Sequence, residues 1–469
     1  MKRLNIIIML SLSALLVSGC AAAPALVKPV LEEEGEVYVY LQPLPQEAGR
    51  LKFTLDHLSL VSSDGNEFPL SLSLAEVNSD SARTQRFVAT GRVPPGRYRG
   101  LYYGVKKATL RGDEGEAVLL VPEGPVTTDF TFEIRRKQAV VLSLVFRYAE
   151  SVRSGFSFSP VFSVYVPATP ASGLMGYVTN RGDNTITVFD KKSGEVRGMI
   201  ATGRGPEAVA LDQKAGRAYA ALSGEDEIDV LDVTTGRFVN TIRLNVGDGP
   251  AWLALTPDGR TLLAVNAVSR TLGIIDPQAL AELARIPLGD GPRFVLIDRT
   301  GLRCYVFNVI SSTISVIDIA HRALVATLSA DPGPTMGQFN RKGDKLYVIH
   351  EWGPYLSVID PFLLSVVQRV YVGPGLCAIK VDTNNDMIYA ARRDEVRIEV
   401  YDPFTLVAGA YIEAMSDVRY MTIDGEENNL VLLSTENKKL MALNLISKKI
   451  AAETDVGENP TCLTMMGER

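Results

Sequence analysis

A repeat of about 42 residues in the C-terminal part of the chain limits the fold more than any other feature, because equivalent sequences build equivalent structural units. One residue closes a short apolar segment in each copy, and the series is Asp190, Asp232, Asp276, Asp318, Asp360, Asp402 and Asn444. A second anchor lies thirteen residues before each of these: Tyr177, Tyr219, Leu263, Tyr305, Tyr347, Tyr389 and Val431. A third anchor follows them: Pro206, Pro250, Pro292, Pro334, Leu376, Val418 and Pro460. Agreement of seven copies at three positions excludes a chance match.

Each copy holds four short apolar segments separated by turn residues. In the first copy they are Tyr177–Thr179, Thr185–Phe189, Val196–Ala201 and Ala208–Leu211. Four strands in about 40 residues are typical of one blade of a β-propeller. The sequence therefore predicts an all-β chain with a seven-bladed propeller at residues 174–469. The repeat begins one strand late and ends on a spare strand, so we expect Pro460–Met466 to pair with blade one and close the ring.

The first copy opens with Tyr177-Val178-Thr179-Asn180, which resembles the YVTN-type propeller repeats. Leu263–Asn266 and Tyr305–Asn308 are variants of this motif, and the Gly-Pro that precedes several inner strands also matches. The resemblance covers the whole repeat region and implies a propeller of this type. It departs where Leu376 and Val418 replace the proline, and the seventh copy lacks the tyrosine.

Residues 1–19 are typical of a secretory signal, with two basic residues before an apolar run of 12 residues. A permanent membrane-spanning helix needs about 20 residues. The run leads into Val17-Ser18-Gly19-Cys20, which resembles a bacterial lipobox and implies cleavage before Cys20 and lipidation of its thiol. By resemblance to Gram-negative lipoproteins, Ala21 favours the outer membrane. Residues 20–34 would then form a lipidated tether.

Residues 35–167 lack the repeat and carry β-rich runs between turn residues. The runs are Val37–Leu41, Phe53–Val61, Val118–Val121, Phe130–Ile134, Val140–Phe146 and Phe156–Val166. They predict a β-sandwich of about seven to nine strands, followed by a linker at residues 168–173. Pro94–Tyr98, together with the later Phe158–Pro160 segment, resembles a lipoprotein-associated β-sandwich domain of unknown function.

Composition argues against several classes of function. A formal net charge of −6 leaves no basic field for nucleic acid. The chain has three His and four Cys, no Cys-x-x-Cys-His and no Gly-x-Ser-x-Gly, so we predict no cofactor, no metal site and no catalytic residue. Lipidation of Cys20 leaves Cys304, Cys377 and Cys462, an odd number in different repeats, and we expect buried free thiols.

One face of the predicted propeller is the best candidate for binding. The loops that enter the first strand of each blade and leave the second strand meet at this face, and both tryptophans fall there. The predicted binding residues are Trp252, Arg293, His350, Glu351, Trp352, Tyr355, Arg392, Arg393, Arg419 and Tyr420. Aromatic residues beside arginines suit a protein partner or an anionic ligand. Alternatively, the arginines are solvated or paired with Asp394 and Asp417.

These patterns predict a membrane-anchored lipoprotein of the cell envelope that acts as a non-enzymatic binding or scaffold module. Its partners would be the membrane, through the N-terminal lipid, and a protein or glycan; it would sit in the outer membrane, on the periplasmic side or the cell surface. One alternative is a metal-dependent hydrolase or lactonase-like enzyme, for which the candidate ligands of a divalent metal are Asn180, Asn266, Asn308 and Glu207. Another is an accessory subunit of an envelope redox or export complex.

Overall fold

The computed structural model describes residues 28–113, 115–170, 172–415 and 417–469. The predicted signal and Cys20 lie outside the described residues. The described chain is all-β, with forty strands and three short helical turns, η1 (Gln46–Arg50), α1 (Tyr148–Ser151) and η2 (Ser172–Leu174). None of its helices has the length and apolarity to cross a membrane.

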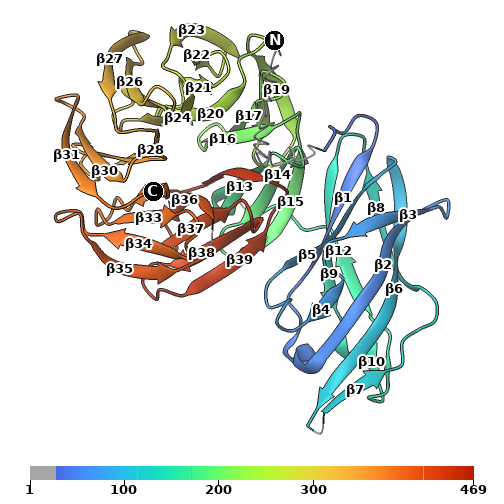
Figure 1. Ribbon diagram of the computed structural model, residues 1–469. Helices are drawn as coiled ribbons and strands as arrows, with labels where there is room; N and C mark the ends of the chain where they lie inside the picture. The colour runs from blue at the N-terminus through green and yellow to red at the C-terminus, as the bar shows by residue number, and fades with distance from the viewer. Residues whose placement is uncertain (1–27, 114, 171, 416) are drawn as a thin grey trace, which may run out of the picture.

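The N-terminal part forms one ten-stranded sheet in the order β12-β9-β1-β5-β3-β2-β6-β7, with β4 on β2 and β8 on β6 (Figure 1). Its strands are β1 (Gly35–Leu41), β2 (Leu51–Ser62), β3 (Glu67–Leu72), β4 (Glu76–Asn78), β5 (Arg86–Val93), β6 (Gly96–Gly112), β7 (Gly115–Leu119), β8 (Val126–Ile134), β9 (Ala139–Phe146) and β12 (Phe162–Tyr165). A short pair, β10 (Val152–Arg153) and β11 (Ser157–Phe158), lies beside it.

This sheet is a half-barrel, which corrects the expected sandwich of two separate sheets. Strand β3 pairs with both β2 and β5, so the hydrogen bonding runs without a break from one side to the other. The long strands β2 and β6 shift register at several points, and such irregularities bend a strand. The curled sheet therefore encloses one core, in which Phe53 and Phe146 stack with ring centroids 5.5 Å apart.

The C-terminal part is a seven-bladed propeller of four-stranded sheets, as the repeat predicts. Blade one is β15-β14-β13-β40, and blades two to seven each take four consecutive strands from β16 to β39. The first three blades contain β13 (Met175–Asn180), β14 (Thr185–Asp190), β15 (Val196–Ala201), β16 (Pro206–Asp212), β17 (Arg217–Leu222), β18 (Glu227–Asp232), β19 (Phe238–Arg243), β20 (Pro250–Leu255), β21 (Leu262–Asn266), β22 (Thr271–Asp276), β23 (Ala281–Pro287) and β40 (Pro460–Met465).

The remaining blades follow the same plan. Their strands are β24 (Pro292–Ile297), β25 (Arg303–Asn308), β26 (Thr313–Asp318), β27 (Ala323–Ser329), β28 (Pro334–Phe339), β29 (Leu346–His350), β30 (Tyr355–Asp360), β31 (Ser365–Tyr371), β32 (Leu376–Val381), β33 (Ile388–Arg392), β34 (Arg397–Tyr401), β35 (Ala408–Glu413), β36 (Val418–Asp424), β37 (Asn429–Ser434), β38 (Lys439–Asn444) and β39 (Ile450–Asp455).

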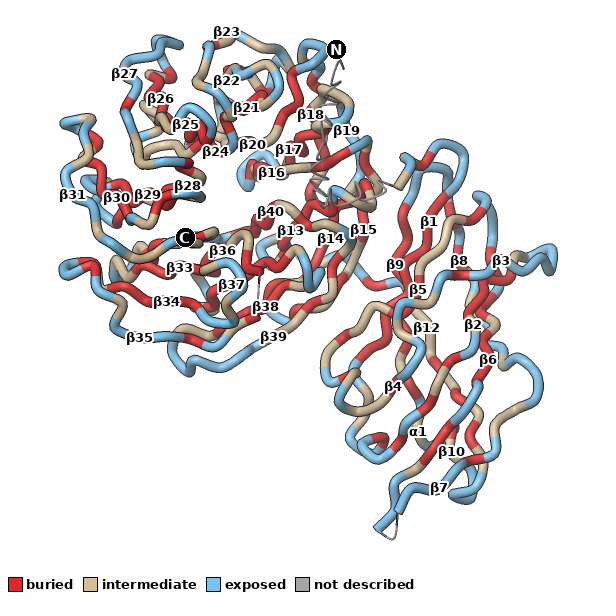
Figure 2. Tube along the Cα trace, in the orientation of Figure 1, coloured by how far each residue is buried: buried red, intermediate tan, exposed pale blue. Residues whose placement is uncertain are grey.

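Position within the blade explains which residues repeat. The second strand is covered on both faces by neighbouring blades, so every residue of β13 and β37 is buried. The fourth strand is largely exposed, as in β31 (Figure 2). The repeated aspartate holds the turn before the fourth strand: Asp190 Oδ1 accepts the backbone N–H groups of Lys192 and Ser193 at 2.9 and 3.0 Å. Asn444 makes the same two bonds in the seventh blade.

The C-terminal strand lies in the first blade. Strand β40 pairs antiparallel with β13, with Gly176 opposite Met465 and Val178 opposite Leu463. The expected pairing of Pro460–Met466 with blade one is therefore present. Strand β40 also contacts the inner strands of its two neighbours, β16 and β36. The first and last segments of the propeller thus share one sheet.

If β40 closes the ring, its removal will unfold the propeller. Truncation after Glu458 deletes Cys462, Leu463 and Met465, all at most 3% exposed. Loss of a buried Leu or Met side chain alone costs about 2–5 kcal/mol, against a total stability of about 5–15 kcal/mol. We expect no cooperative thermal unfolding of the truncated protein and a loss of about 2–5 kcal/mol for Leu463→Ala, measured by denaturant titration. The control Ile446→Ala, at a 79% exposed turn, should change stability by less than about 0.5 kcal/mol; unaltered stability after truncation would refute a closing role.

Candidate functional site

A cavity of about 490 Å³ lies on the axis of the propeller, because all seven blades contribute to its wall. It is lined by Arg181, Glu207, Ala251, Trp252, Arg293, Phe294, Thr335, Met336, Glu351, Leu376, Cys377, Arg393, Arg419, Tyr420, Thr435, Asn459, Pro460 and Thr461. We call it the axial cavity.

A β-bulge in each inner strand builds this wall. In β16 the partners of Pro206 and Ala208 are consecutive residues of β17, so Glu207 is the extra residue that opposes none. The same irregularity occurs at the third anchor of all six remaining repeats. The seven extra residues are Glu207, Ala251, Arg293, Thr335, Cys377, Arg419 and Thr461, and all of them line the axial cavity. The residue directly after the third anchor is thus the axial position of each blade.

The floor of the axial cavity is aromatic. The ring of Trp252 lies 4.7 Å from that of Phe294 and 5.5 Å from that of Tyr420, between centroids. Trp252 belongs to blade three and Tyr420 to blade seven, so their contact spans the ring axis. The ring of Trp252 is tilted by 50° and 42° to the other two, and together the rings offer an apolar surface to a ligand.

The rim is cationic. Arg181 pairs with Glu207 at 2.9 Å, while Arg293 and Arg393 share Glu351 at 3.4 and 3.5 Å. The fourth arginine of the rim pairs with a buried carboxylate below it: the Arg419 Nε to Asp417 Oδ1 distance is 2.7 Å. Four guanidinium groups are therefore paired with three carboxylates, Glu207 and Glu351 in the lining and Asp417 beside it. The excess of positive charge favours an anionic ligand.

Two further groups of the axial cavity have altered acidity. Burial is the main cause that raises the pKa of Glu207 above its ordinary value, while Arg181, a hydrogen bond from Ser223 and Arg293 oppose it. Burial also raises the pKa of the Cys377 thiol to about 11. That thiol is protonated at neutral pH and donates to the carbonyl oxygen of Val418 at 3.1 Å, so it is a poor nucleophile. Cys304, Cys377 and Cys462 are free thiols; Cys304 and Cys462 are buried as expected, whereas Cys377 is only partly buried because it lines the axial cavity.

Six of the ten predicted face residues line the axial cavity: Trp252, Arg293, Glu351, Arg393, Arg419 and Tyr420. The other four lie outside it. His350 is 1% exposed with Nδ1 3.0 Å from the carbonyl oxygen of Tyr355, and burial lowers the pKa of its imidazole. Trp352 and Tyr355 are 57% and 37% exposed.

Arg392 has a structural environment. Its side chain is 12% exposed, and Nη2 donates to Glu399 Oε2 at 3.0 Å and to the carbonyl oxygen of Val372 at 2.8 Å. Nη1 donates to the carbonyl oxygen of Pro374. The guanidinium group thus ties the loop before blade six to a buried carboxylate. The place of Arg392 in the repeat does not reveal this structural role, because its partner Glu399 lies on the next strand, β34.

The asparagines considered as metal ligands hold strands together. The Nδ2 group of Asn180 donates to the hydroxyls of Thr185 and Thr187 at 3.0 and 2.8 Å, and its Oδ1 accepts from the backbone N–H of Gly457. Asn266 and Asn308 make the equivalent bonds to Thr271 and Thr313, each at 3.1 Å. The described ranges contain no group of three or more His, Cys, Asp or Glu side chains arranged to hold a metal ion.

Sequence reasoning did not include Arg181, Ala251, Thr335, Met336, Cys377 or Thr461 among the site residues. A signal for most of them exists in the repeat itself. Five of the seven residues that follow the third anchor are polar, although an inner strand is expected to be apolar, and the seven share one structural position. Arg181 instead comes from the loop after β13.

No protein-family model and no curated protein matches the chain. Similar solved structures include a functionally unknown protein from Desulfotomaculum acetoxidans, with a TM-score of 0.56, 14% identity and coverage of 62% of this chain and 98% of that one. A candidate 6-phosphogluconolactonase from Bacteroides fragilis has a TM-score of 0.52 and 17% identity, with coverage of 64% and 99%. The dihydro-heme d1 dehydrogenase NirN has a TM-score of 0.50 and 14% identity, with coverage of 64% and 77%. At these identities the likeness shows the propeller fold alone.

The environment of Arg392 predicts a change in stability. Removal of one partner from a buried ion pair costs about 3–5 kcal/mol, because the remaining charge is left uncompensated. We expect Arg392→Ala to lower the free energy of unfolding by that amount, since Glu399 is 8% exposed and loses its cationic partner, keeping the hydrogen bond from the Tyr401 hydroxyl. Arg393→Ala is the matched control, because its 45% exposed side chain makes a surface pair worth less than about 1 kcal/mol. Equal effects of the two variants in denaturant titrations would contradict this assignment.

Proposed function

We propose that the protein is a lipid-anchored binding module of the cell envelope and that its axial cavity receives an anionic group of a protein or glycan partner. The observation that carries this proposal is the combination of four arginines at the rim with the Trp252–Tyr420 floor. Arginine forms directed, charge-assisted hydrogen bonds to carboxylate, sulfate or phosphate groups. The aromatic floor adds apolar contact for the group that carries the charge.

The cavity also has the form expected of a recognition site. Trp and Arg are the residue types that contribute most to binding energy when they lie in a concave, central position. Three of the rim arginines are 45–60% exposed, so a partner's anion can replace water around them. Arg293 and Arg393 compete for one carboxylate, Glu351, which leaves them free hydrogen-bond donors for a ligand.

The anchoring part of the proposal rests on the N-terminal sequence. A signal-like run ends at the lipobox-like Val17–Cys20, and several acyl chains on one residue give stable membrane attachment. With Ala21 after the cysteine, we infer the outer membrane as the site of anchoring. The YVTN-type motifs support an envelope protein of this class.

The axial cavity is tested with naphthalene-2-sulfonate, a flat apolar anion, by isothermal titration calorimetry of the purified protein. We expect binding that weakens by about tenfold or more in Trp252→Ala, because a stacked aromatic partner is lost. Arg293→Ala should weaken it about threefold to tenfold through the lost charge-assisted bond. Trp352→Ala is the matched control and should bind as the unaltered protein does, since Trp352 lies outside the cavity.

A companion variant tests the charge balance of the rim. Glu207→Gln should tighten sulfonate binding, because it removes one of two rim carboxylates. The unaltered protein should approach the same affinity as the pH falls through the raised pKa of Glu207, since protonation removes the same charge. Equal binding of the uncharged naphthalene-2-methanol, or an unaffected Trp252→Ala variant, would overturn the proposal. A stoichiometric divalent metal in the purified protein would favour the metal-dependent hydrolase instead.

The lipid anchor is tested by fractionation of cells that express the full chain. We expect the unaltered protein to sediment with membranes and to enter the detergent phase, because its acyl chains partition into the bilayer. Cys20→Ser removes the thiol that receives the lipid and should release the protein to the soluble fraction. Cys304→Ser is the control, since that thiol is buried in β25. Membrane association that survives Cys20→Ser would refute the anchor.

A further inference from the structure

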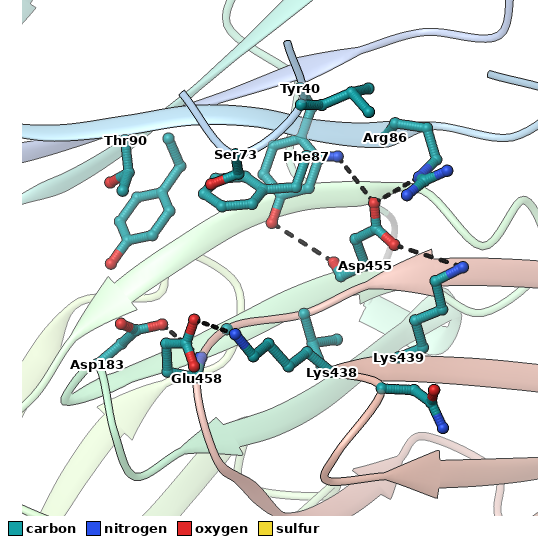
Figure 3. Close-up of a pocket in the computed structure, with 15 residues that line it drawn as sticks. Tyr40, Ser73, Arg86, Phe87, Thr90, Asp183, Lys438, Lys439, Asp455 and Glu458 are labelled. Atoms are coloured by element: carbon teal, nitrogen blue, oxygen red, sulfur yellow. Dashed lines mark hydrogen bonds and ion pairs between the residues drawn. The ribbon is translucent and has the colours of Figure 1, made fainter. Parts of the chain in front are cut away.

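A second cavity, of about 270 Å³, lies where the half-barrel meets the propeller (Figure 3). We call it the junction cavity. The half-barrel contributes residues from β1 and β5 and from the loop after β3, and the propeller contributes residues of blades one and seven. Its volume is slightly below the ~300–1,000 Å³ of sites for drug-sized ligands, so it suits a smaller molecule.

The two walls of the junction cavity are held together by defined contacts. Asp455 of β39 accepts the side chain of Arg86 at 2.8 Å and the backbone N–H of Phe87 at 3.0 Å (Figure 3). On the adjacent blade the backbone N–H of Val196 donates to Gln85 Oε1 at 2.7 Å, and Gln85 Nε2 donates back to the Val196 carbonyl at 3.3 Å. The cavity is therefore preformed, which lowers the ordering cost of binding.

The charges that line the junction cavity balance. Three cations, Arg86, Lys438 and Lys439, face three carboxylates, Asp183, Asp455 and Glu458. Lys438 pairs with Glu458, and Arg86 pairs with Asp455. A ligand with a net charge would therefore give the cavity an excess of positive or of negative charge. The lining thus differs from the rim of the axial cavity, where arginine is in excess.

The charged groups that line the junction cavity keep capacity for further hydrogen bonds. An ammonium group has three donors, and a carboxylate can accept about four bonds. Asp183, for example, accepts the backbone N–H of Glu458 through Oδ2 at 2.6 Å, and its carboxylate can accept further hydrogen bonds. A molecule whose hydroxyls both donate and accept can use both kinds of group at once.

One wall of the junction cavity is aromatic. Phe87 is partly exposed and presents most of this aromatic surface, while Tyr40, whose ring centroid lies 5.3 Å away, is 1% exposed and supports it from behind. The side chains of Ser73 and Thr90 add hydroxyls to the same wall (Figure 3). The flat C–H face of a sugar ring packs on such a surface while its hydroxyls point to the polar wall. We propose that the junction cavity binds a single neutral sugar residue, free or at the end of a glycan.

The test compares three sugars that share one pyranose ring and differ in charge, on the full-length protein, by saturation-transfer NMR and calorimetry. N-acetylglucosamine is neutral, glucosamine is a cation and glucuronate is an anion. We expect N-acetylglucosamine to bind with a dissociation constant of about 1 mM or tighter, and each charged sugar to bind about threefold or more weakly. Tighter binding of either charged sugar, or no binding of N-acetylglucosamine at about 10 mM, would overturn the proposal.

Variants locate the bound sugar. Lys438→Met should weaken N-acetylglucosamine binding about threefold to tenfold through lost hydrogen bonds. Lys448→Met is a matched control, because Lys448 also has a positive φ in blade seven but does not line the cavity. Ser73→Trp should block the cavity without altering the Asp455 contacts. Sugar binding that survives Ser73→Trp and is lost in Trp252→Ala would place the sugar in the axial cavity and refute the proposed site.

Discussion

The bulge at the start of each inner strand is the constraint on which the axial cavity depends. Within a regular strand, alternate side chains point into the two neighbouring blades and are committed to the core. One extra residue interrupts that alternation, so its side chain is released toward the axis. Because all seven repeats carry the bulge, the ring gains seven positions, from Glu207 to Thr461, whose side chains line the axial cavity.

The half-barrel meets the ring at one distinct place. It contacts blade one, in which the first and last strands of the propeller share a sheet, and the neighbouring blade seven. Tyr40 and Val141 of the half-barrel pack with Val196 and Met199 of β15, and Asp455 of blade seven adds the polar contact. The half-barrel therefore lies across the boundary between the two ends of the repeat region and can brace it. The charges that line the junction cavity balance, in contrast to the excess of arginine at the axial cavity.

The sequence-based predictions agree best with the structure where one repeated residue type has a single structural role. The aspartate series marks a turn in which the side chain bonds backbone N–H groups, and the tyrosine series marks a buried second strand. Agreement is weaker in the N-terminal part. The longest strand there, β6, was not among the expected runs, because its four glycines and alternating basic residues hide its buried Tyr98, Leu101 and Tyr103. The half-barrel itself follows from register shifts between β2 and β6, which no local pattern displays.

By itself, the sequence determined the all-β class, the seven equivalent units, their turns and the pairing partner of the last strand, since each follows from local periodicity and from the phase of the repeat. It also placed aromatic and arginine residues at one end of the ring. Only the tertiary structure decided which of these face a common space. Arg393 and Arg392 are neighbours in the chain, yet one reaches Glu351 of another blade at the rim of the axial cavity and the other is buried against Glu399. That difference depends on groups brought together from separate strands and blades, and distance in space is not encoded by spacing along the chain.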